Sequence, residues 1–122
     1  FAEGVDKTEA LLETYPELDA IFGVEAYGAP VAATVLKEQG RAGEIIVGGF
    51  DDLAETITGI KDGSVHFCLV QKAYKMGWMS VEILLDMMNG KEIPKVIDTG
   101  VIIVNKDNVD SYMAQVKAEL QQ

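Results

Sequence analysis

Three short, unbroken apolar segments recur along this chain, and a helix-like pattern follows each of them. They read LDAIFG at residues 18–23, EIIVGGF at 44–50 and VHFCLVQ at 65–71. Strands that are apolar on both faces are typical of parallel sheets, in which the connecting helices cover the two faces. The alternation therefore predicts an α/β fold: a parallel sheet with helices on both faces, joined by right-handed crossovers.

The segments around these strands show helical spacing and helix stop signals. A first helix is expected to end before Pro16, and a second, over residues 27–40, carries Pro30 in its first turn, where proline is tolerated. A third helix is expected to start at Asp52, as its N-cap, and to end at Gly63.

The fourth helical segment, about Lys72 to Asn89, is apolar around almost its whole circumference. This is the pattern of a helix that is buried on more than one side. A chain of 122 residues offers little surface to bury it. We therefore expect this helix to pack on something outside the sequence or to form an oligomer contact. After Pro94 an extended segment leads to a final helix, with Asp107 or Asn108 as its cap.

Charge and composition narrow the possible partners. Ten basic and twenty acidic residues give a formal net charge of −10, which repels nucleic acid and anionic membrane surfaces. No apolar stretch is long enough for a transmembrane helix, and the first residues do not resemble a signal peptide. The single cysteine, Cys68, lies in an apolar strand and is expected to be a buried, inert thiol.

The ends of the strands carry the residues that suit a ligand. In open parallel sheets, ligands bind beyond the carboxyl ends of the strands, and here these ends fall near residues 23–27, at Phe50 and Asp51, and at Gln71. A carboxylate accepts two hydroxyl hydrogens, an amide both donates and accepts, and a ring can cover the C–H face of a sugar. The alternative is that Asp51 or Asp52 only caps the next helix.

Several segments together resemble the type I periplasmic sugar-binding proteins, the ribose and galactose group of receptors for ABC importers. They are YPELDAIFG, GEIIVGGFDD, IKDGSVHFCLVQ, the MG of YKMGWMSVEILLDMMNGKEIP, and IDTGVIIVNKDNVDSY, in the order typical of the family. The resemblance covers nearly the whole chain. It implies a partial C-terminal lobe, because the chain enters a parallel sheet through a helix with no strand before it.

The resemblance implies five ligand-binding residues. Asp51 resembles the sugar-binding aspartate of the family, Phe50 the aromatic residue before it, and Gln71 the glutamine at the hinge. Glu25 stands where the family has an asparagine or aspartate, and this longer carboxylate changes the size and charge of the pocket. Tyr27 is either an aromatic wall of the pocket or only the start of a helix.

The resemblance also implies an organisation and a mechanism. Residues 1–71 would form βα units of the lobe, residues 72–96 would carry the helix that packs on the missing N-terminal lobe, and residues 97–122 would return as a strand and a C-terminal helix. Two lobes would close on a sugar or polyol and dock on an ABC permease, outside the cytoplasm: in the periplasm, or as a cell-surface lipoprotein in a Gram-positive cell. Alone, the fragment is expected to associate through Trp78 and its neighbours.

Two other functions remain as alternatives. The effector-sensing domain of a LacI-type transcriptional regulator has the same fold, although its C-terminal end differs from IDTGVIIVNKDNVDSY. An enzyme is not expected, since the only histidine, His66, alternates with apolar residues on a strand and is interpreted as structural. The sequence also lacks a metal-ligand cluster and a nucleotide loop, so no cofactor or metal is predicted.

Overall fold

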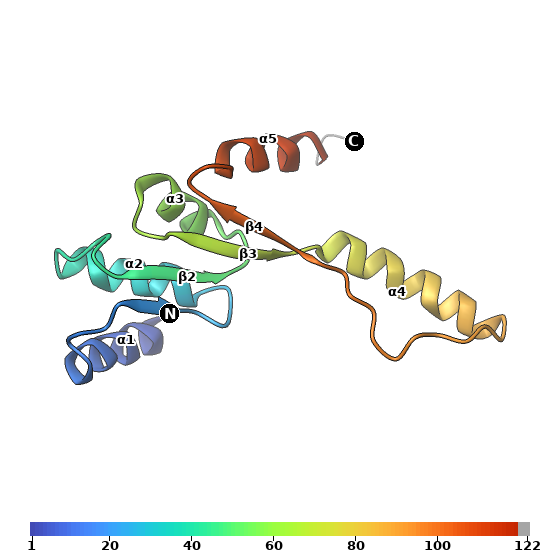
Figure 1. Cartoon of the computed structure of the whole chain (residues 1–122), viewed down its shortest axis with the longest axis horizontal. Helices are drawn as coiled ribbons and strands as arrows, with labels where there is room; N and C mark the ends of the chain where they lie inside the picture. The colour runs from blue at the N-terminus through green and yellow to red at the C-terminus, as the bar shows by residue number, and fades with distance from the viewer. Residues whose placement is uncertain (120–122) are drawn as a thin grey trace. The chain divides into compact units, whose positions relative to one another are not determined.

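The structure is a computed structural model, and it describes residues 1–119. Helices and strands alternate along these residues (Figure 1): α1 (Ala2–Thr14), β1 (Ala20–Phe22), α2 (Gly28–Glu38), β2 (Ile46–Phe50), α3 (Ala54–Asp62), β3 (Phe67–Gln71), α4 (Ala73–Met88), β4 (Val101–Asn105) and α5 (Val109–Glu119). The chain divides into two compact units, residues 71–102 and the remainder.

The four strands form one sheet in the order β1-β2-β3-β4. β1 pairs with β2 in parallel, with Ile21 opposite Val47, and β2 pairs with β3 in parallel, with Gly49 opposite Cys68. β4 lies next to β3 and runs back in the opposite direction (Figure 1). The predicted α/β fold is confirmed, with a returning edge strand added to the parallel core.

Burial differs between the two faces of the sheet. Val47, Cys68 and Val104 are completely buried on one face, where α2 packs on β1 and β2. On the other face, Phe22 and Ile46 keep 44% and 49% of their surface exposed. Among the described residues, the side chains of the strands therefore alternate between a buried row and a half-exposed row.

A close contact between α2 and β2 explains a glycine in the buried row. A Cβ on Gly49 would lie only 2.6 Å from the Cβ of Ala29, so a larger residue would force α2 away from the sheet. Ala29, Val35 and Leu36 of α2 are almost completely buried. The pair of small residues lets the helix approach the strand that leads into the candidate site.

Helix boundaries agree closely with the sequence signals. Pro30 is the third residue of α2, and α3 ends at Gly63, whose φ of 88° is the left-handed conformation that glycine adopts without strain. The expected cap at Asp52 is wrong, however. The N-cap of α3 is Leu53, with no side-chain cap hydrogen bond, because the Asp52 carboxylate has another partner.

The second unit consists of α4 and the segment that follows it. α4 spans Ala73–Met88, as predicted, and none of its residues is buried within the described chain. Tyr74 and Trp78 stack with their ring centroids 6.5 Å apart beside an apolar hollow of about 670 Å³ along the helix. Within residues 1–119, no helix is both long and apolar enough to cross a membrane.

Candidate functional site

The turn between β2 and α3 places Asp51 directly after the last residue of a central strand. Its φ of 62° makes it the one non-glycine residue with positive φ in the described chain. The Asp51 amide donates a hydrogen bond of 2.9 Å to the carbonyl of Leu69, which completes the last parallel pair of β2 and β3, Phe50 with Leu69. A left-handed aspartate is uncommon and costs backbone energy, and such strain concentrates at functional sites.

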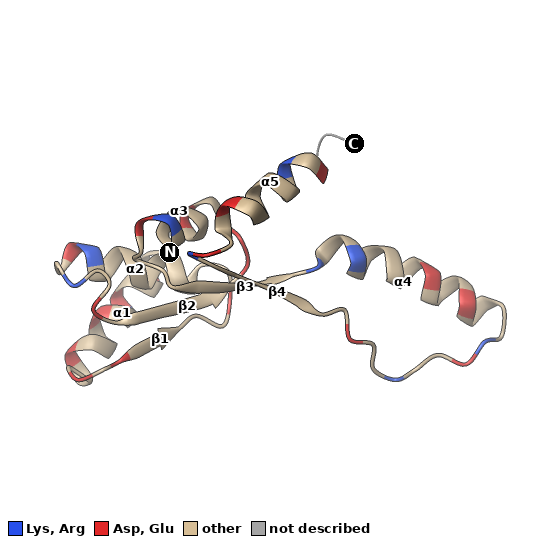
Figure 2. Ribbon diagram, turned by 45° about the horizontal axis from the view of Figure 1, so that its top comes forward, with Lys and Arg blue, Asp and Glu red and all other residues tan. Residues whose placement is uncertain are grey.

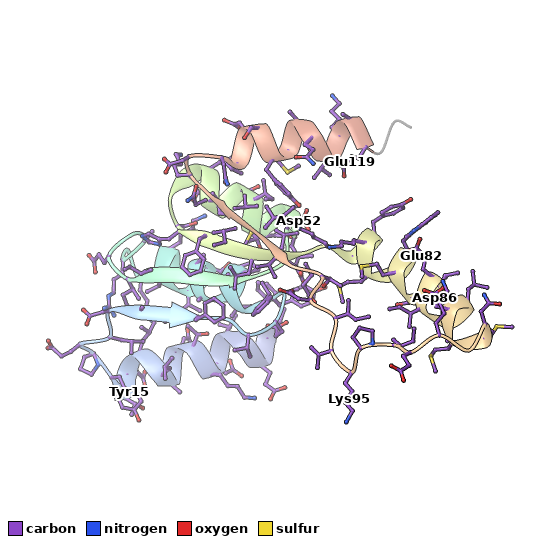
Figure 3. The ribbon with its side chains drawn as sticks, turned by 45° about the vertical axis from the view of Figure 1, so that its right-hand side comes forward. Tyr15, Asp52, Glu82, Asp86, Lys95 and Glu119 are labelled. Carbon is purple, nitrogen blue, oxygen red and sulfur yellow. The ribbon has the colours of Figure 1, made fainter. Side chains whose placement is uncertain are left out.

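The next residue, Asp52, is bound to the C-terminal helix. Its Oδ2 accepts a hydrogen bond of 2.6 Å from the Tyr112 hydroxyl of α5, and Figure 3 shows Asp52 below that helix. Burial and this hydrogen bond to Asp52 raise the pKa of Tyr112 well above its usual range. The hydroxyl is therefore a permanent donor at neutral pH. Asp52 does not cap α3. The alternative that one of the two aspartates only caps this helix therefore does not apply to Asp52.

Cys68 lies on β3, beneath the same turn. Burial, together with the charges of Asp52 and Asp51, raises the pKa of the Cys68 thiol to about 11. The side chain is completely buried, so the thiol stays protonated and inaccessible. The predicted burial of Cys68 is confirmed, and the two nearby carboxylates add to the rise in its pKa.

The aromatic residue of the turn, Phe50, belongs to a cluster on the partly open face of the sheet. Its ring meets the ring of Phe22 edge to face, at a centroid distance of 5.7 Å, and Phe22 stacks on Phe67 at 6.0 Å. The Phe67 ring covers Gly48, where an added Cβ would lie 2.5 Å from it. Phe50 is half-buried by this cluster, which holds its ring at the carboxyl end of β2.

The turn between β1 and α2 holds the other two predicted residues. Gly23 and Gly28 touch through their backbones, since a Cβ on Gly23 would lie 2.6 Å from the Cα of Gly28. Glu25 folds back over the start of α2, and its Oε2 accepts a hydrogen bond of 2.9 Å from the amide of Tyr27. Tyr27 is the N-cap residue of α2, as one of the two readings expects, and its ring is exposed. Its role as an aromatic wall of the ligand pocket stays a prediction.

An open pocket of about 520 Å³ lies at this turn. Glu25 and Tyr27 line it together with Phe22, and the start of α1 supplies Lys7 and Thr8. The pocket combines two carboxylates, a phenol, two phenylalanine rings and an ammonium group, and the Lys7 ammonium forms an ion pair of 2.7 Å with the second carboxylate, Glu3. This mixture of polar groups and rings fits a polar ligand that also offers an apolar face.

The five predicted residues thus lie at three strand ends. Glu25 and Tyr27 share one pocket, and Phe50 is linked to that pocket through Phe22. Asp51 follows β2, and Gln71 is the last residue of β3 and the first residue of the second unit. A common cleft for Asp51 and Gln71 stays a prediction.

Sequence reasoning missed two residues of this region, Phe22 and Tyr112. Phe22 could have been found, because it is the last residue before the glycine of the apolar segment LDAIFG and lies at the same edge of the sheet as Phe50. Tyr112 could not, because it is sixty positions from Asp52 in the sequence and no local pattern links them.

The only histidine has a structural role. His66 Nδ1 accepts a hydrogen bond of 3.1 Å from the amide of Val47, and the His66 amide donates one of 2.7 Å to the Val47 carbonyl. Both bonds tie β3 to β2, so the prediction of a structural histidine is confirmed. Within residues 1–119, no three His, Cys, Asp or Glu side chains form a group that could hold a metal ion.

Comparison with known proteins identifies the family. The model of the periplasmic binding protein domain matches residues 2–92. The xylose/arabinose-binding protein XylF of Sulfolobus acidocaldarius is 30% identical over an alignment of 112 residues, which covers 86% of this chain and 28% of that protein. The ribose import binding protein RbsB of Bacillus subtilis is 27% identical over 95 residues, covering 78% of this chain and 30% of that protein.

Solved structures agree with the sequence relatives. A solute-binding protein of an ABC transporter from Burkholderia graminis, in complex with D-arabinose, is 42% identical with a TM-score of 0.80, covering 91% of this chain and 40% of that chain. GanP, a glucose-galactose binding protein from Geobacillus stearothermophilus, is 28% identical with a TM-score of 0.82. The match covers 86% of this chain and 38% of that chain. The chain spans less than a third of the length of its curated relatives. It belongs to the periplasmic binding protein domain family and carries part of the fold of the type I periplasmic sugar-binding proteins.

Proposed function

We propose that this chain is part of the substrate-binding component of an ABC sugar transporter and binds a sugar or polyol. The observation that carries the proposal is Asp51, a left-handed aspartate at the carboxyl end of β2, next to an ordered aromatic ring. A structural turn would use glycine at this φ at lower cost. An aspartate in this strained conformation therefore indicates a function for its carboxylate. A carboxylate suits a ligand that is rich in hydroxyl groups.

We assign a role to each of the five residues. The Asp51 carboxylate accepts hydrogen bonds from two sugar hydroxyls, and the Gln71 amide both donates and accepts. The Phe50 ring covers the C–H face of the sugar, and Tyr27 forms a second wall. Glu25 accepts a hydroxyl hydrogen and selects against anionic sugars, since its charge repels a carboxylate or phosphate.

The proposed mechanism is binding without chemical turnover. Two lobes close on the sugar, and the closed form delivers it to a membrane permease outside the cytoplasm, in the periplasm or, in a Gram-positive cell, as a surface lipoprotein. The sugar shifts the equilibrium toward the closed form only through its better contacts there. The relatives support the binding of a sugar, since proteins of the same fold are named as sugar-binding proteins or solved with D-arabinose or D-fucose bound.

A sugar screen of the full-length protein tests the proposal. Thermal unfolding is measured with D-xylose, D-ribose, D-arabinose, D-fucose, D-allose, D-galactose and myo-inositol, and each hit is titrated by calorimetry. A sugar at 100 times its Kd stabilises the folded protein by about 2.7 kcal/mol. That corresponds to a rise in melting temperature of several degrees.

The matched control for the screen is Asp51→Asn. Asparagine tolerates the left-handed backbone and has nearly the same shape, so the substitution removes the charge and replaces one acceptor oxygen by an NH2 donor. We expect the melting temperature without ligand to stay close to that of the parent, while the shift with sugar falls to about half or less, because a tenfold rise in Kd lowers the stabilisation from about 2.7 to about 1.4 kcal/mol. A full-length protein that responds to none of the sugars, or equally in both forms, would contradict the proposal.

A Further Inference From the Structure

The Asp51–Asp52 turn is connected to a residue with no assigned role in binding. Tyr112 lies in the first turns of α5, and its hydroxyl is 2.6 Å from Asp52 Oδ2. The two residues are sixty positions apart in the sequence, so this bond is a tertiary contact and not part of a local turn motif. Both belong to the same compact unit.

The first amides of α3 are a second possible partner for the Asp52 carboxylate, but it does not bind them. An aspartate shortly before a helix ordinarily accepts hydrogen bonds from the first amides of that helix. Here α3 begins at Ala54 with no side-chain cap, and its N-cap is Leu53, in an extended conformation with φ of −53° and ψ of 149°. The bond to Tyr112 therefore keeps Asp52 away from the helix end.

This choice affects the preceding residue directly, because Asp51 and Asp52 share a peptide plane. If Asp52 turned back to cap α3, that plane would rotate and change the ψ of Asp51, so the turn in which Asp51 keeps its φ of 62° would have to rearrange. The Asp51 amide is held on the other side by the Leu69 carbonyl at 2.9 Å. The strained residue is thus held between two fixed points, one on β3 and one on α5.

We propose that Tyr112 is a positioning residue for ligand binding: through Asp52 it holds the turn in the conformation that directs Asp51 to the sugar. This inference rests on the proposed function, and it adds α5 to the machinery of the site. Tyr112 itself does not touch the ligand. A phenol suits the task, since burial and its bond to Asp52 raise the pKa of Tyr112 and keep the hydroxyl protonated.

A purely structural role is the competing explanation. α5 also contacts α3, and Lys61 forms an ion pair of 2.7 Å with Asp110, so Tyr112 could serve only to attach the helix. Such a role would lower the stability of the fold and leave the affinity of the folded molecules unchanged. The two roles therefore differ in what Tyr112→Phe does to Kd.

The test uses the full-length protein and D-arabinose, or the tightest-binding sugar of the screen. Tyr112→Phe removes one oxygen and keeps the ring. We expect a five- to twentyfold rise in Kd by calorimetry, with circular dichroism showing that the variant is folded. Tyr15→Phe, an exposed tyrosine at the end of α1 (Figure 3), is the matched control and is expected to leave Kd unchanged.

Two further variants show whether the effect passes through Asp52 and Asp51. Asp52→Ala should raise Kd as much as Tyr112→Phe does, whereas Asp52→Asn, which keeps an oxygen for the hydroxyl to donate to, should stay within about threefold of the parent. In an Asp51→Asn background, Tyr112→Phe should cause no further loss. An unchanged Kd for Tyr112→Phe, or an equal loss in the Asp51→Asn background, would overturn the proposal.

A measurement without ligand separates this inference from the proposed function. Hydrogen exchange of the Asp51 amide reports its bond to Leu69, and we expect at least tenfold faster exchange in Tyr112→Phe, with the amides of β1 unchanged. If no sugar binds but this exchange accelerates, the proposed function fails and the positioning of the turn stands. If the exchange is unchanged, the positioning inference fails whether or not a sugar binds.

Discussion

At the scale of single residues, Asp51 carries a cost that a different residue would avoid. Its φ of 62° lies in the region that glycine adopts freely and that other residues pay for with about 1 kcal/mol. The bond from its amide to Leu69 and the bond between Asp52 and Tyr112 hold it there. Stability and binding are therefore expected to oppose each other at this position.

Substitution of this residue should expose that opposition. Asp51→Gly removes the strain, which stabilises the fold, and the contacts of the carboxylate, which destabilises it, so we expect the free energy of unfolding to change by no more than about 1 kcal/mol. Sugar affinity should fall tenfold or more, because hydrogen bonds to a charged group contribute about 1.5–3 kcal/mol. Urea unfolding and calorimetry measure the two effects. A fall in stability of more than about 1 kcal/mol would show that the aspartate side chain is mainly structural.

At the scale of elements, an acidic residue joins two helices on the covered side of the sheet. Asp62, the last residue of α3, accepts hydrogen bonds from Lys37 of α2 at 2.7 Å and from the amide and hydroxyl of Ser64 at 3.0 and 2.7 Å. Burial acts to raise the pKa of Asp62, but these bonds outweigh it and lower the pKa from 3.8 to about 2. Figure 2 shows the charged residues spread over the surface of these helices.

The lowered pKa predicts a pH dependence. Because the pKa of Asp62 is lower in the folded than in the unfolded state, its stabilising effect is present above about pH 4 and is lost as the pH falls toward 2. Asp62→Asn should therefore lower the free energy of unfolding at pH 7 by about 1 kcal/mol or less, since the pair is 42–45% exposed.

Urea unfolding from pH 7 to pH 2.5 measures this effect. The difference in the free energy of unfolding between the parent and Asp62→Asn should become smaller as the pH falls below 4. Glu44→Gln, which removes the exposed ion pair with Arg41, gives the baseline for the loss of one surface contact. If this difference stays constant between pH 7 and pH 2.5, the effect of Asp62 comes from the shape of its side chain and not from its charge.

At the scale of the whole molecule, each compact unit exposes apolar surface. The larger unit has the half-exposed row with Phe22, Ile46 and Ile103 on its sheet, and the smaller unit has α4, where Tyr74 and Trp78 are 83% and 59% exposed. Isolated monomers rarely leave large apolar patches uncovered. We propose that α4 packs on the remainder of the full-length protein, and that copies of the 122-residue chain associate through α4 when this remainder is absent.

Sedimentation of the 122-residue chain tests the association. We expect a concentration-dependent dimer or larger species that Trp78→Asp converts to a monomer, because a charge in the contact is costly to bury. Ile46→Thr, on the sheet face, is the control and should leave the association unchanged. A parent chain that stays monomeric at high concentration, or a Trp78→Asp variant that still associates, would contradict the role of α4.

Much of the fold could be predicted because its signals are local. Gly63 ends α3 where only glycine adopts the left-handed φ without strain, and Pro30 lies in the first turn of α2, where its missing amide is not needed. The strand ends that carry Asp51 and Gln71 followed from the apolar segments in the same way. The cap at Asp52 was predicted wrongly, because capping is a local rule and the hydroxyl of Tyr112 competed for the same carboxylate.

The sequence by itself determined the order of the helices and strands, the parallel core of the sheet and the residues at its carboxyl edge. These depend on spacing, apolar runs and turn residues within a few positions of each other. Only the tertiary structure decided which sheet face is buried, that Phe50 packs on Phe22, and that Tyr112 holds Asp52. Those contacts join residues that are far apart in the chain, and their energies exist only after the intervening elements have packed.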